Sequence, residues 1–434
     1  MLTSTGYITN GNSELKRLLT VRPIATEGFA PPKPFRVFRE KGSHMCLPRY
    51  FGTSHFPEPP TDKRNNPRGV DVEFVGNLRP ELRQVEARAL GIKALEETGG
   101  GVLSLPCGYG KSITSLAIAT HFKLRTMIMV HKEFLANQWR DVIQQFCPGS
   151  SIGLVQGDKT EIDCDFVICM IQTMSQREYP IGTFDSIGVL IVDEAHHICA
   201  RVFSQCMFKL CPKYTLGLTA TPDRKDGLTR VLYWFLGPNF FTVDRTSDNV
   251  LVEPVDFRGP FPGVSVTRNG QLSLPEMITD LTMIEERNKL LISTIDKCLQ
   301  DDRNILVLSD RREHSKFLLE YYGDIAGLYI GGMTRDQLDE SSKKKLIIAT
   351  FSLAQEGLDI PKLDTAIFAT PKSDIVQASG RILRSKGRQP IIYDIVDHWS
   401  VFFPMFKKRC AQYNNMQFTI NQMQIMQKKT GCLL

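Results

Sequence analysis

The stretch LPCGYGKS at residues 105–112 decides the fold, and it follows directly on the apolar run GVLSL at residues 101–105. An apolar run that ends in a glycine-rich turn is typical of a buried parallel strand followed by a helix. Glycines let backbone N–H groups approach phosphates, and the helix N-terminus adds partial positive charge. We therefore predict a phosphate-binding loop, with Lys111 reaching the β- and γ-phosphates of ATP and the Ser112 hydroxyl binding Mg²⁺.

This loop departs from the general pattern in one place, because Leu105 stands six residues before Lys111, where the pattern has a glycine. A chance glycine-rich turn is the alternative, and the setting between a strand and a helix argues against it. The residues expected to contact the nucleotide are Pro106, Cys107, Gly108, Tyr109, Gly110, Lys111 and Ser112.

Apolar runs alternate with polar or helical sequence around this loop. Helical spacing covers residues 82–95, and buried strands are predicted at residues 101–105, 126–130, 165–168, 189–192 and 214–218. A less regular stretch rich in proline and glycine, residues 244–279, is followed by a predicted helix at residues 280–299. Further strands are predicted at residues 305–309, 326–330, 346–350, 365–369 and 389–394. This alternation predicts the α/β class, with two tandem parallel sheets covered by helices on both faces.

The predicted domains are an N-terminal accessory segment (residues 1–75), a first α/β unit (76–247), a second (248–420) and a tail (421–434). The accessory segment is small and irregular, with short strands around residues 35–38 and 46–51. We expect it to pack on the first unit, and contact with nucleic acid is the alternative.

Composition narrows the class of protein. The 434 residues are 42% hydrophobic, which is enough for two cores, and no apolar run approaches the ~18 residues of a membrane span. The N-terminus has no secretory signal pattern and the 11 cysteines are scattered, which predicts a cytoplasmic or nuclear protein with reduced thiols. The net charge of +6 permits an anionic partner without requiring one.

The first unit carries two more chemical motifs at strand ends. In VLIVDEAHH, residues 189–197, we predict that Asp193 holds Mg²⁺ through water and that Glu194 polarises the attacking water. Two acids after a strand are otherwise a helix N-terminal charge pair. In LGLTATP, residues 216–222, the hydroxyls of Thr219 and Thr221 are expected to sense the γ-phosphate and couple its state to motion. We place His196 at the interface between the units, also for coupling.

The second unit supplies TFSLAQEGLDIP at residues 350–361 and QASGRILR at residues 377–384. On a helix, Gln377, Arg381 and Arg384 fall at i, i+4 and i+7 and share one face. Arginines so aligned are often only solvated charge. Here they follow a glycine-rich turn in a unit without its own phosphate loop, which predicts arginine fingers for the neighbouring nucleotide, with Gln377 positioning water or phosphate.

Together and in this order, the motifs resemble those of superfamily 2 helicases over roughly residues 78–400. LPCGYGKS is similar to motif I, DEAH to motif II, TAT to motif III, TFSLAQEGLDIP to motif V and QASGRILR to motif VI. PCGYGKS, LGLTATPDRKDG and GRILR are most similar to the XPB/UvsW-like branch. PPKPFRVFRE and PRYFG resemble transcript-release helicases of poxviruses and other large DNA viruses. The resemblance implies two RecA-like domains with the ATP site in the cleft between them.

By the same resemblance Gln84 takes the place of an adenine-reading glutamine, although Leu78-Arg79 and Leu82-Arg83 compete for the register. Segments 130–132 and 138–139 correspond to motif Ia, and residues 309–311 to motif IV. The family would use such residues to line a groove across both domains and grip the nucleic-acid backbone. The alternative is that Lys132 and Arg311 are ordinary surface cations. The implied nucleic-acid contacts are His131, Lys132, Arg311 and Thr350, and the implied nucleotide contacts in motif V are Gly357 and Asp359.

The expected function is an ATP-dependent helicase or translocase, moving 3′→5′ on DNA, with RNA or an RNA–DNA hybrid as the other substrates. The alternative is an ATP-driven remodeller that releases transcripts or proteins without processive strand separation. The resemblance also implies a partner in transcription or repair machinery and a place in a virion or viral replication site. A degenerate, non-enzymatic relative is disfavoured by the intact Lys111 and Glu194. A small-molecule kinase is disfavoured by the second unit.

Overall fold

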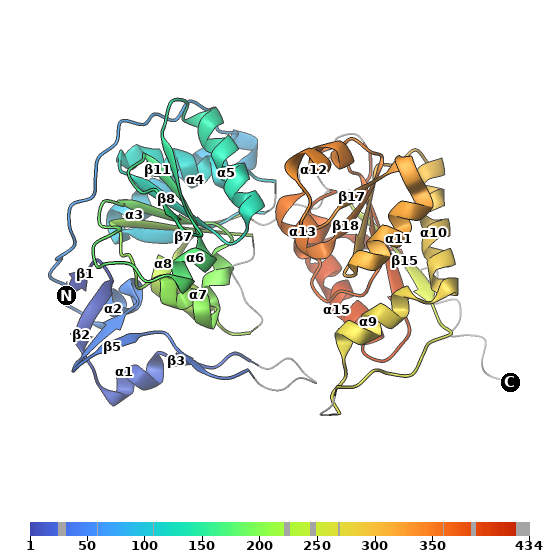
Figure 1. Ribbon diagram of the computed structural model, residues 1–434, viewed down its shortest axis with the longest axis horizontal. Coiled ribbons are helices and arrows are strands. Elements are labelled where there is room, and N and C mark those ends of the chain that lie inside the picture. The colour runs from blue at the N-terminus through green and yellow to red at the C-terminus, as the bar shows by residue number, and fades with distance from the viewer. Residues whose placement is uncertain are drawn as a thin grey trace. The chain divides into compact units, whose positions relative to one another are not determined.

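The computed structural model describes residues 1–421 except residues 25–31, 59, 107, 221–225, 244–248, 268–269, 359 and 383–387. The chain divides into two compact units, Met1–Asp244 and Arg245–Leu434 (Figure 1). In the described parts of both units, no helix is long and apolar enough to cross a membrane.

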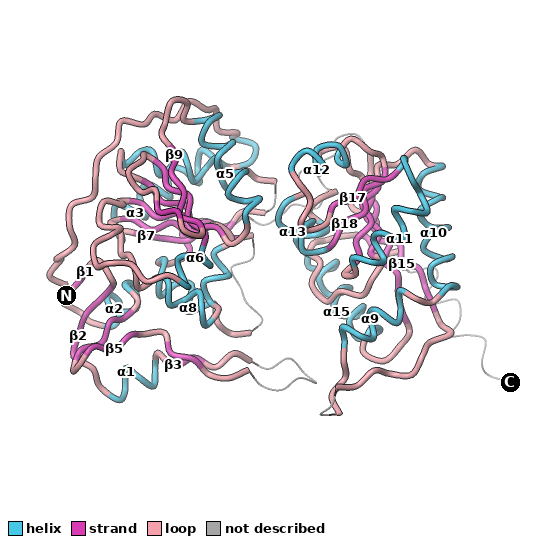
Figure 2. Tube along the Cα trace, viewed as in Figure 1, coloured by secondary structure: helices cyan, strands magenta, loops and turns pink. Residues whose placement is uncertain are grey.

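The first unit is built on an eight-stranded sheet whose order is β10-β9-β11-β8-β12-β13-β7-β14 (Figure 2). Every neighbouring pair is parallel except β9 with β10. The strands are β7 (Gly100–Ser104), β8 (Thr126–Val130), β9 (Ile152–Gln156), β10 (Lys159–Thr160), β11 (Phe166–Met170), β12 (Val189–Val192), β13 (Tyr214–Thr219) and β14 (Asn239–Thr242). The predicted parallel sheet is present, and β9 and β14 extend it beyond the predicted strands.

Each face of this sheet carries its own apolar core, because the strands are buried on both sides. One core includes Leu95, Ile118 and Trp139 from α3 (Gln84–Thr98), α4 (Lys111–Ala119) and α5 (Glu133–Phe146). The other includes Met174, Cys206 and Phe235 from α6 (Ile171–Gln176), α7 (Arg201–Cys206) and α8 (Thr229–Leu236).

The N-terminal segment is more regular than its proline content predicts. It forms an antiparallel sheet of β1 (Leu2–Thr3), β2 (Gly6–Asn10), β6 (His44–Leu47) and β5 (Arg39–Lys41), with helices α1 (Ser13–Leu18) and α2 (Arg49–His55). A separate two-stranded ribbon pairs β3 (Thr20–Val21) with β4 (Phe35–Arg36). The prediction of a strand around residues 46–51 was wrong in its second half. Residues 46–47 belong to β6, whereas residues 49–51 form the start of α2.

This segment is fastened to the first unit. The Tyr50 hydroxyl and Thr215 Oγ1 are hydrogen-bonded at 2.8 Å, and Arg49 Nη1 donates to the carbonyls of Pro212 and Lys213 at 3.1 and 2.9 Å. These bonds, together with the apolar contacts of Phe51 and Trp234, hold the described residues of this segment in one compact body with the first sheet.

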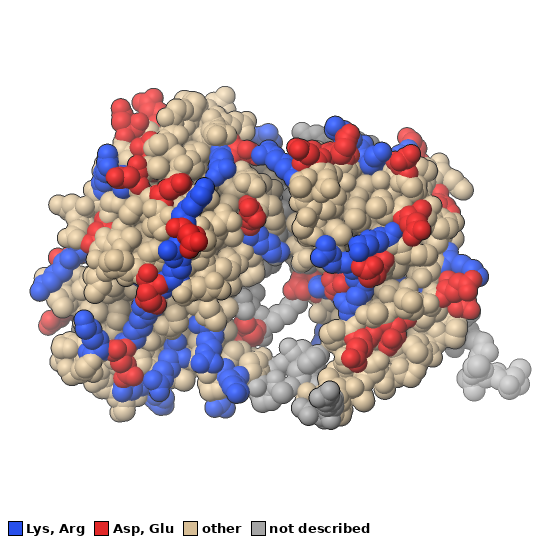
Figure 3. Space-filling view, in the orientation of Figure 1, with Lys and Arg blue, Asp and Glu red and all other residues tan. Residues whose placement is uncertain are grey.

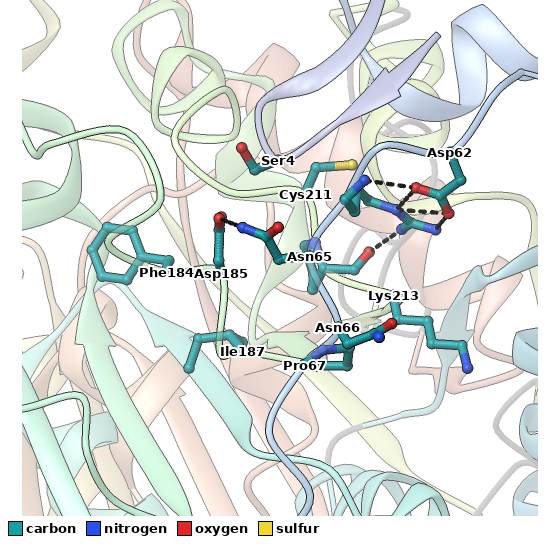
Figure 4. A pocket seen from close by; sticks show the side chains of 12 residues that line it. Ser4, Asp62, Asn65, Asn66, Pro67, Phe184, Asp185, Ile187, Cys211 and Lys213 are labelled. Atoms are coloured by element: carbon teal, nitrogen blue, oxygen red, sulfur yellow. Dashed lines mark hydrogen bonds and ion pairs between the residues drawn. The ribbon is translucent and has the colours of Figure 1, made fainter.

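The linker after this segment borders a pocket of about 140 Å³ (Figure 4). Arg64 Nη2 pairs there with Asp62 Oδ2 at 2.6 Å, and its Nη1 donates to the Pro212 carbonyl at 2.6 Å. Asn65 donates to the Asp185 carboxylate. The hydrogen bonds of Arg64 to Pro212 and of Asn65 to Asp185 therefore attach the linker to the first unit at the wall of this pocket.

The second unit holds a seven-stranded sheet, all parallel, in the order β17-β18-β16-β19-β20-β15-β21. Its strands are β15 (Leu251–Phe257), β16 (Ile305–Ser309), β17 (Ala326–Tyr329), β18 (Leu346–Thr350), β19 (Thr365–Phe368), β20 (Ile391–Asp397) and β21 (Thr419–Ile420). Its helices are α9 (Leu274–Thr282), α10 (Glu285–Gln300), α11 (Arg312–Tyr322), α12 (Arg335–Ser342), α13 (Phe351–Gly357), α14 (Val376–Ser379) and α15 (Phe402–Asn415). The two sheets confirm the predicted pair of RecA-like parallel-sheet domains.

Two predictions for the second unit were wrong. The stretch expected to be irregular contains β15, where Pro254 lies beyond the two residues paired with β21, so its missing N–H falls on an unpaired edge. The single helix expected over residues 280–299 is two helices, because Ile284 has an extended backbone and the Asn288 side chain donates to the Thr282 carbonyl at 2.9 Å.

Candidate nucleotide site

The phosphate loop runs from the end of β7 to the start of α4. Gly108 and Gly110 have φ angles of 88° and 76°, a left-handed conformation that favours glycine. A Cβ on Gly110 would lie 2.3 Å from Gln84 Nε2. Both the backbone conformation and the close approach therefore require glycine at position 110. Cys107, one of the expected nucleotide contacts, lies outside the described part of the chain.

Hydrogen bonds connect this loop to the neighbouring strand. Lys111 Nζ donates to the Leu105 carbonyl at 3.1 Å, and the Leu105 N–H donates to the Thr219 carbonyl at 3.1 Å. Ser112 lies in the first turn of α4, a nine-residue helix whose first turn has no acidic residue. The helix N-terminus thus keeps the positive partial charge that favours a phosphate.

The carboxylates lie at the carboxyl end of β12, two strands from β7 with β13 between them. Asp193 Oδ1 accepts the Glu194 N–H at 3.0 Å, and Oδ2 accepts Trp139 Nε1–H at 2.9 Å. Burial and then the Glu194 charge raise the pKa of Asp193, while the Trp139 hydrogen bond and the Lys111 charge lower it. The electrostatic interaction with Lys111 places this carboxylate near the phosphate loop.

Glu194 is held in an unusual conformation, with φ 45° and ψ 53°. A non-glycine residue in this region costs about 1–3 kcal/mol and is commonly found at functional sites. Glu194 is 7% exposed, and its Oε2 lies 3.5 Å from His196 Nδ1. That oxygen makes no hydrogen bond within the described residues. A buried carboxylate oxygen without a hydrogen bond in the protein can accept one from a water molecule or a ligand.

This combination fits a nucleotide with a divalent cation. The glycine cradle and α4 suit phosphate, Lys111 supplies positive charge, and the Ser112 hydroxyl and Asp193 carboxylate are oxygen ligands of the kind Mg²⁺ prefers. Asp193 keeps further lone pairs on each oxygen after its two protein hydrogen bonds.

The predicted motif Ia residues are mostly buried. His131 is 7% exposed and its ring lies 3.9 Å from that of His197, which in turn lies 4.3 Å from that of His196. Trp139 is 1% exposed. His131 and Trp139 face the interior and half-buried Lys132 is nearer solvent, so the nucleic-acid contacts expected of His131 and Lys132 stay predictions.

Gln84 lies at the start of α3 against the phosphate loop. Its Oε1 accepts the Arg79 N–H at 2.9 Å and its Nε2 donates to the Tyr109 carbonyl at 2.9 Å, with the side chain 2% exposed. In this structure both ends of the amide therefore bind the chain itself. Gln84 thus lies beside the loop, and both its contact with the nucleotide and its role in reading adenine stay predictions.

The second unit arranges motifs V and VI differently from the prediction. α14 ends at Ser379 and Arg381 lies in the following turn, so the prediction that one helix carries both Gln377 and Arg381 was wrong. Arg381 is 7% exposed and its Nη1 donates to the Leu358 carbonyl at 2.8 Å, which ties motif VI to motif V. The side chain of Gln377 and all of Asp359, Arg384 and Thr221 lie outside the described residues, and Gly357 ends α13.

Arg311 and Thr350 were the nucleic-acid contacts expected in this unit. Arg311 is half-buried at the start of α11, where Nε donates to Thr279 Oγ1 at 2.9 Å and Nη2 donates to the Pro275 carbonyl. Its guanidinium therefore fastens α11 to α9. Thr350 ends β18 and its Oγ1 accepts the Ser352 hydroxyl at 3.5 Å.

A family model described as "Type III restriction enzyme, res subunit" matches residues 73–224. Protein L396 of Acanthamoeba polyphaga mimivirus, whose name describes an ATP-dependent RNA helicase, is 34% identical over 442 residues, 95% of this chain and 84% of its own. Helicase 161L of Invertebrate iridescent virus 6 is 27% identical over 81% of this chain and 84% of its own. The crystal structure of T4 UvsW aligns with 94% of each chain at 17% identity and a TM-score of 0.34.

Two parallel-sheet RecA-like units, the first with a phosphate loop beside paired carboxylates, define a nucleotide-hydrolysing enzyme. The chain belongs to the superfamily 2 helicases and is an ATP-dependent helicase, related to those of large DNA viruses.

Proposed function

We propose that this helicase moves 3′→5′ along DNA and hydrolyses Mg²⁺-bound ATP in a cleft between its two α/β units. The observation that carries the proposal is that the predicted phosphate loop and the carboxylates lie close together in the first unit. Lys111 bonds to the loop and interacts electrostatically with Asp193, while Glu194 keeps a buried carboxylate oxygen without a hydrogen bond in the described structure.

Each of these residues takes one part of hydrolysis. Lys111 leaves the Leu105 carbonyl to bind the β- and γ-phosphates, and the backbone N–H groups of the glycine-rich turn hold them. Ser112, and Asp193 through water, would hold Mg²⁺, which would offset negative charge on the phosphate oxygens. Glu194 orients the attacking water through its Oε2 and accepts a proton from it. Thr219 stays bonded to Leu105 and senses movement of the loop.

The second unit completes the reaction in this proposal. Arg384 donates a guanidinium to the charge that develops on the transferring phosphoryl group. Arg381, bonded to the Leu358 carbonyl, positions motif V so that Gly357 and Asp359 can reach the nucleotide. Hydrolysis then requires both units, so ATP binding and release can drive a cycle of movement.

The alternative activity is remodelling that strips transcripts or proteins from nucleic acid without separating strands. It uses the same site, and the RNA helicase name of the mimivirus relative favours testing RNA beside DNA. Transcription or repair machinery would then be the protein partner, at a viral replication site or in a virion.

The deciding experiment measures ATPase turnover without nucleic acid and with single-stranded DNA, duplex DNA or RNA, followed by strand displacement on each overhang polarity. Stimulation by DNA with displacement from a 3′ overhang supports the proposal. Stimulation without displacement on any substrate favours the remodeller. Turnover that ignores every nucleic acid would contradict both.

A further inference from the structure

The exposed face of the β3–β4 ribbon and helix α1 concentrates positive charge. Figure 3 shows Lys and Arg side chains gathered over these elements at the lower left of the first unit. We call this surface the basic ribbon face and define it by five exposed residues, which are Lys16, Arg17, Arg22, Lys33 and Arg36.

Strand alternation separates this face from the core. Thr20 pairs with Arg36 and Val21 with Phe35, so Arg36 and Arg22 project to one side of the ribbon. Val21 and Phe35, on the other side, are 0% and 6% exposed in the core below the first sheet. The ribbon is therefore fixed on its apolar side and offers its cationic side to solvent.

The charge on this face is not balanced locally. Glu40 is shared between Lys16 at 2.6 Å and Arg36 at 3.5 Å, and Arg17, Arg22 and Lys33 make no ion pair in the described parts of the chain. With Glu14 counted as well, five cations face two acids, a net charge of +3. The Lys16 and Arg36 side chains are 50% and 70% exposed, so they can reach an anionic partner without losing buried contacts.

The ribbon is also hydrogen-bonded to a helix that follows the predicted nucleotide site in the chain. The Arg36 carbonyl accepts Gln205 Nε2–H at 3.0 Å, and Arg39 Nη2 donates to the Gln205 carbonyl at 2.8 Å. Gln205 lies on α7, which begins two residues after the turn Ala195–Cys199 that follows the catalytic carboxylates. A partner bound on the ribbon would thus be held at a fixed position relative to Glu194.

We propose that the basic ribbon face is a second nucleic-acid contact, which binds the phosphodiester backbone at a place separate from the helicase motifs. This inference rests on the proposed function, because it assumes that the protein acts on nucleic acid. A two-stranded ribbon has the width of a duplex major groove, and its cations can also follow a single strand, so the shared chemistry is the phosphate backbone.

The test neutralises the ribbon with the triple variant Arg22→Gln, Lys33→Gln, Arg36→Gln in the full chain. A matched control removes three exposed charges scattered elsewhere on the first unit, Lys63→Gln, Lys93→Gln, Lys159→Gln. Fluorescence anisotropy gives the affinity of parent and variants for single-stranded DNA, duplex DNA and RNA across a salt series. ATPase turnover without nucleic acid and the melting temperature are measured in parallel.

Each lost phosphate contact lowers the slope of log K against log salt by about 0.9 on duplex and about 0.7 on single strands. We expect the ribbon variant to lose about 2–3 in slope on the substrate that it contacts, with basal ATPase and melting temperature unchanged. A separate double variant, Arg22→Lys with Arg36→Lys, should bind nucleic acid about as tightly as the parent, because the positive charges remain.

Equal slopes and affinities in parent and ribbon variant would overturn the inference and leave the proposed function intact. An equal loss in the scattered-lysine control would also overturn it, because general charge would then explain the effect. If the parent itself binds no nucleic acid, the proposed function fails first and the ribbon contact fails with it.

Discussion

Trp139 and Asp193 are joined by a hydrogen bond in which the indole Nε1–H donates to the carboxylate Oδ2 at 2.9 Å. Trp139 lies on α5, which begins directly after Lys132, the motif Ia cation expected to contact nucleic acid. The carboxylate is the predicted Mg²⁺ ligand. One rigid helix therefore connects a predicted nucleic-acid contact with the nucleotide site, and a second connection runs through the rings of His131, His197 and His196 to Glu194.

We expect Trp139→Phe to weaken the binding of Mg²⁺ and leave the fold intact. The ring stays packed, but Asp193 loses the donor that orients its carboxylate, and loss of such a partner typically costs ~10-fold or more in metal affinity. The measurement is the Mg²⁺ concentration that half-saturates binding of a fluorescent ATP analogue. Trp234→Phe, outside the site, is the matched control. An unchanged Mg²⁺ requirement in Trp139→Phe would remove Trp139 from the site.

Glu194→Gln should keep nucleotide binding and lose turnover. The amide has the size of the carboxylate but cannot accept the proton of the attacking water, and loss of a general base costs ~10²-fold or more. Steady-state ATPase and nucleotide affinity are measured side by side, with the exposed Glu133→Gln as the control. Turnover near that of the parent would contradict the role given to Glu194.

Arg381 and Arg384 should respond differently to alanine substitution. Arg384→Ala should lower stimulated ATPase by ~10³-fold or more with little change in melting, as expected for a finger that acts in the transition state. Arg381→Ala should also destabilise the second unit by about 1–3 kcal/mol, because it removes a buried hydrogen bond to Leu358. Calorimetry and ATPase assays separate the effects, and Arg384→Lys should fail to rescue. Parent-like stimulated turnover in Arg384→Ala would rule out its role as a finger.

The second unit should lose stability in mild acid because of His314. Burial, with the nearby Arg287 charge, lowers the pKa of His314 to about 3. Its Nδ1 lies 3.1 Å from Ser309 Oγ and its Nε2 lies 3.1 Å from Asn288 Oδ1. The unfolded ring protonates below about pH 6.5, whereas the folded ring stays neutral to about pH 3. The stabilisation is therefore complete above pH 6.5 and declines as the pH falls from 6.5 to 3.

The loss of stability between pH 6.5 and pH 3 is tested by comparing melting at one pH above 6.5 and one pH below it. Between pH 6.5 and 5 the single group is expected to cost on the order of 2 kcal/mol. Calorimetric melting of parent and His314→Asn at pH 7.5 and pH 5 isolates its contribution, because other titrating groups are common to both proteins. An equal drop in melting temperature for the two would show that His314 does not carry the pH dependence.

The strands and motif positions were predictable because their signals are local. β8, β12, β16 and β18 have the predicted bounds, since each is a short apolar run between polar segments. β15 was missed because Pro254 is a breaker in most strands, and only its place at an unpaired edge makes it acceptable. The break between α9 and α10 depends on the Asn288 side chain, which apolar periodicity does not detect.

The sequence by itself determined the class of protein, the phosphate loop and the order of the motifs, because these depend on residue type and spacing along the chain. The tertiary structure decided which side chains meet. Trp139, expected to line a groove, points to Asp193, since its position on the apolar side of α5 turns it inward. Arg381, expected on an open helical face, is buried against Leu358 because α14 ends at Ser379. Such contacts join residues that are distant in the chain, and only the packing of helices onto the sheets brings them within hydrogen-bonding distance.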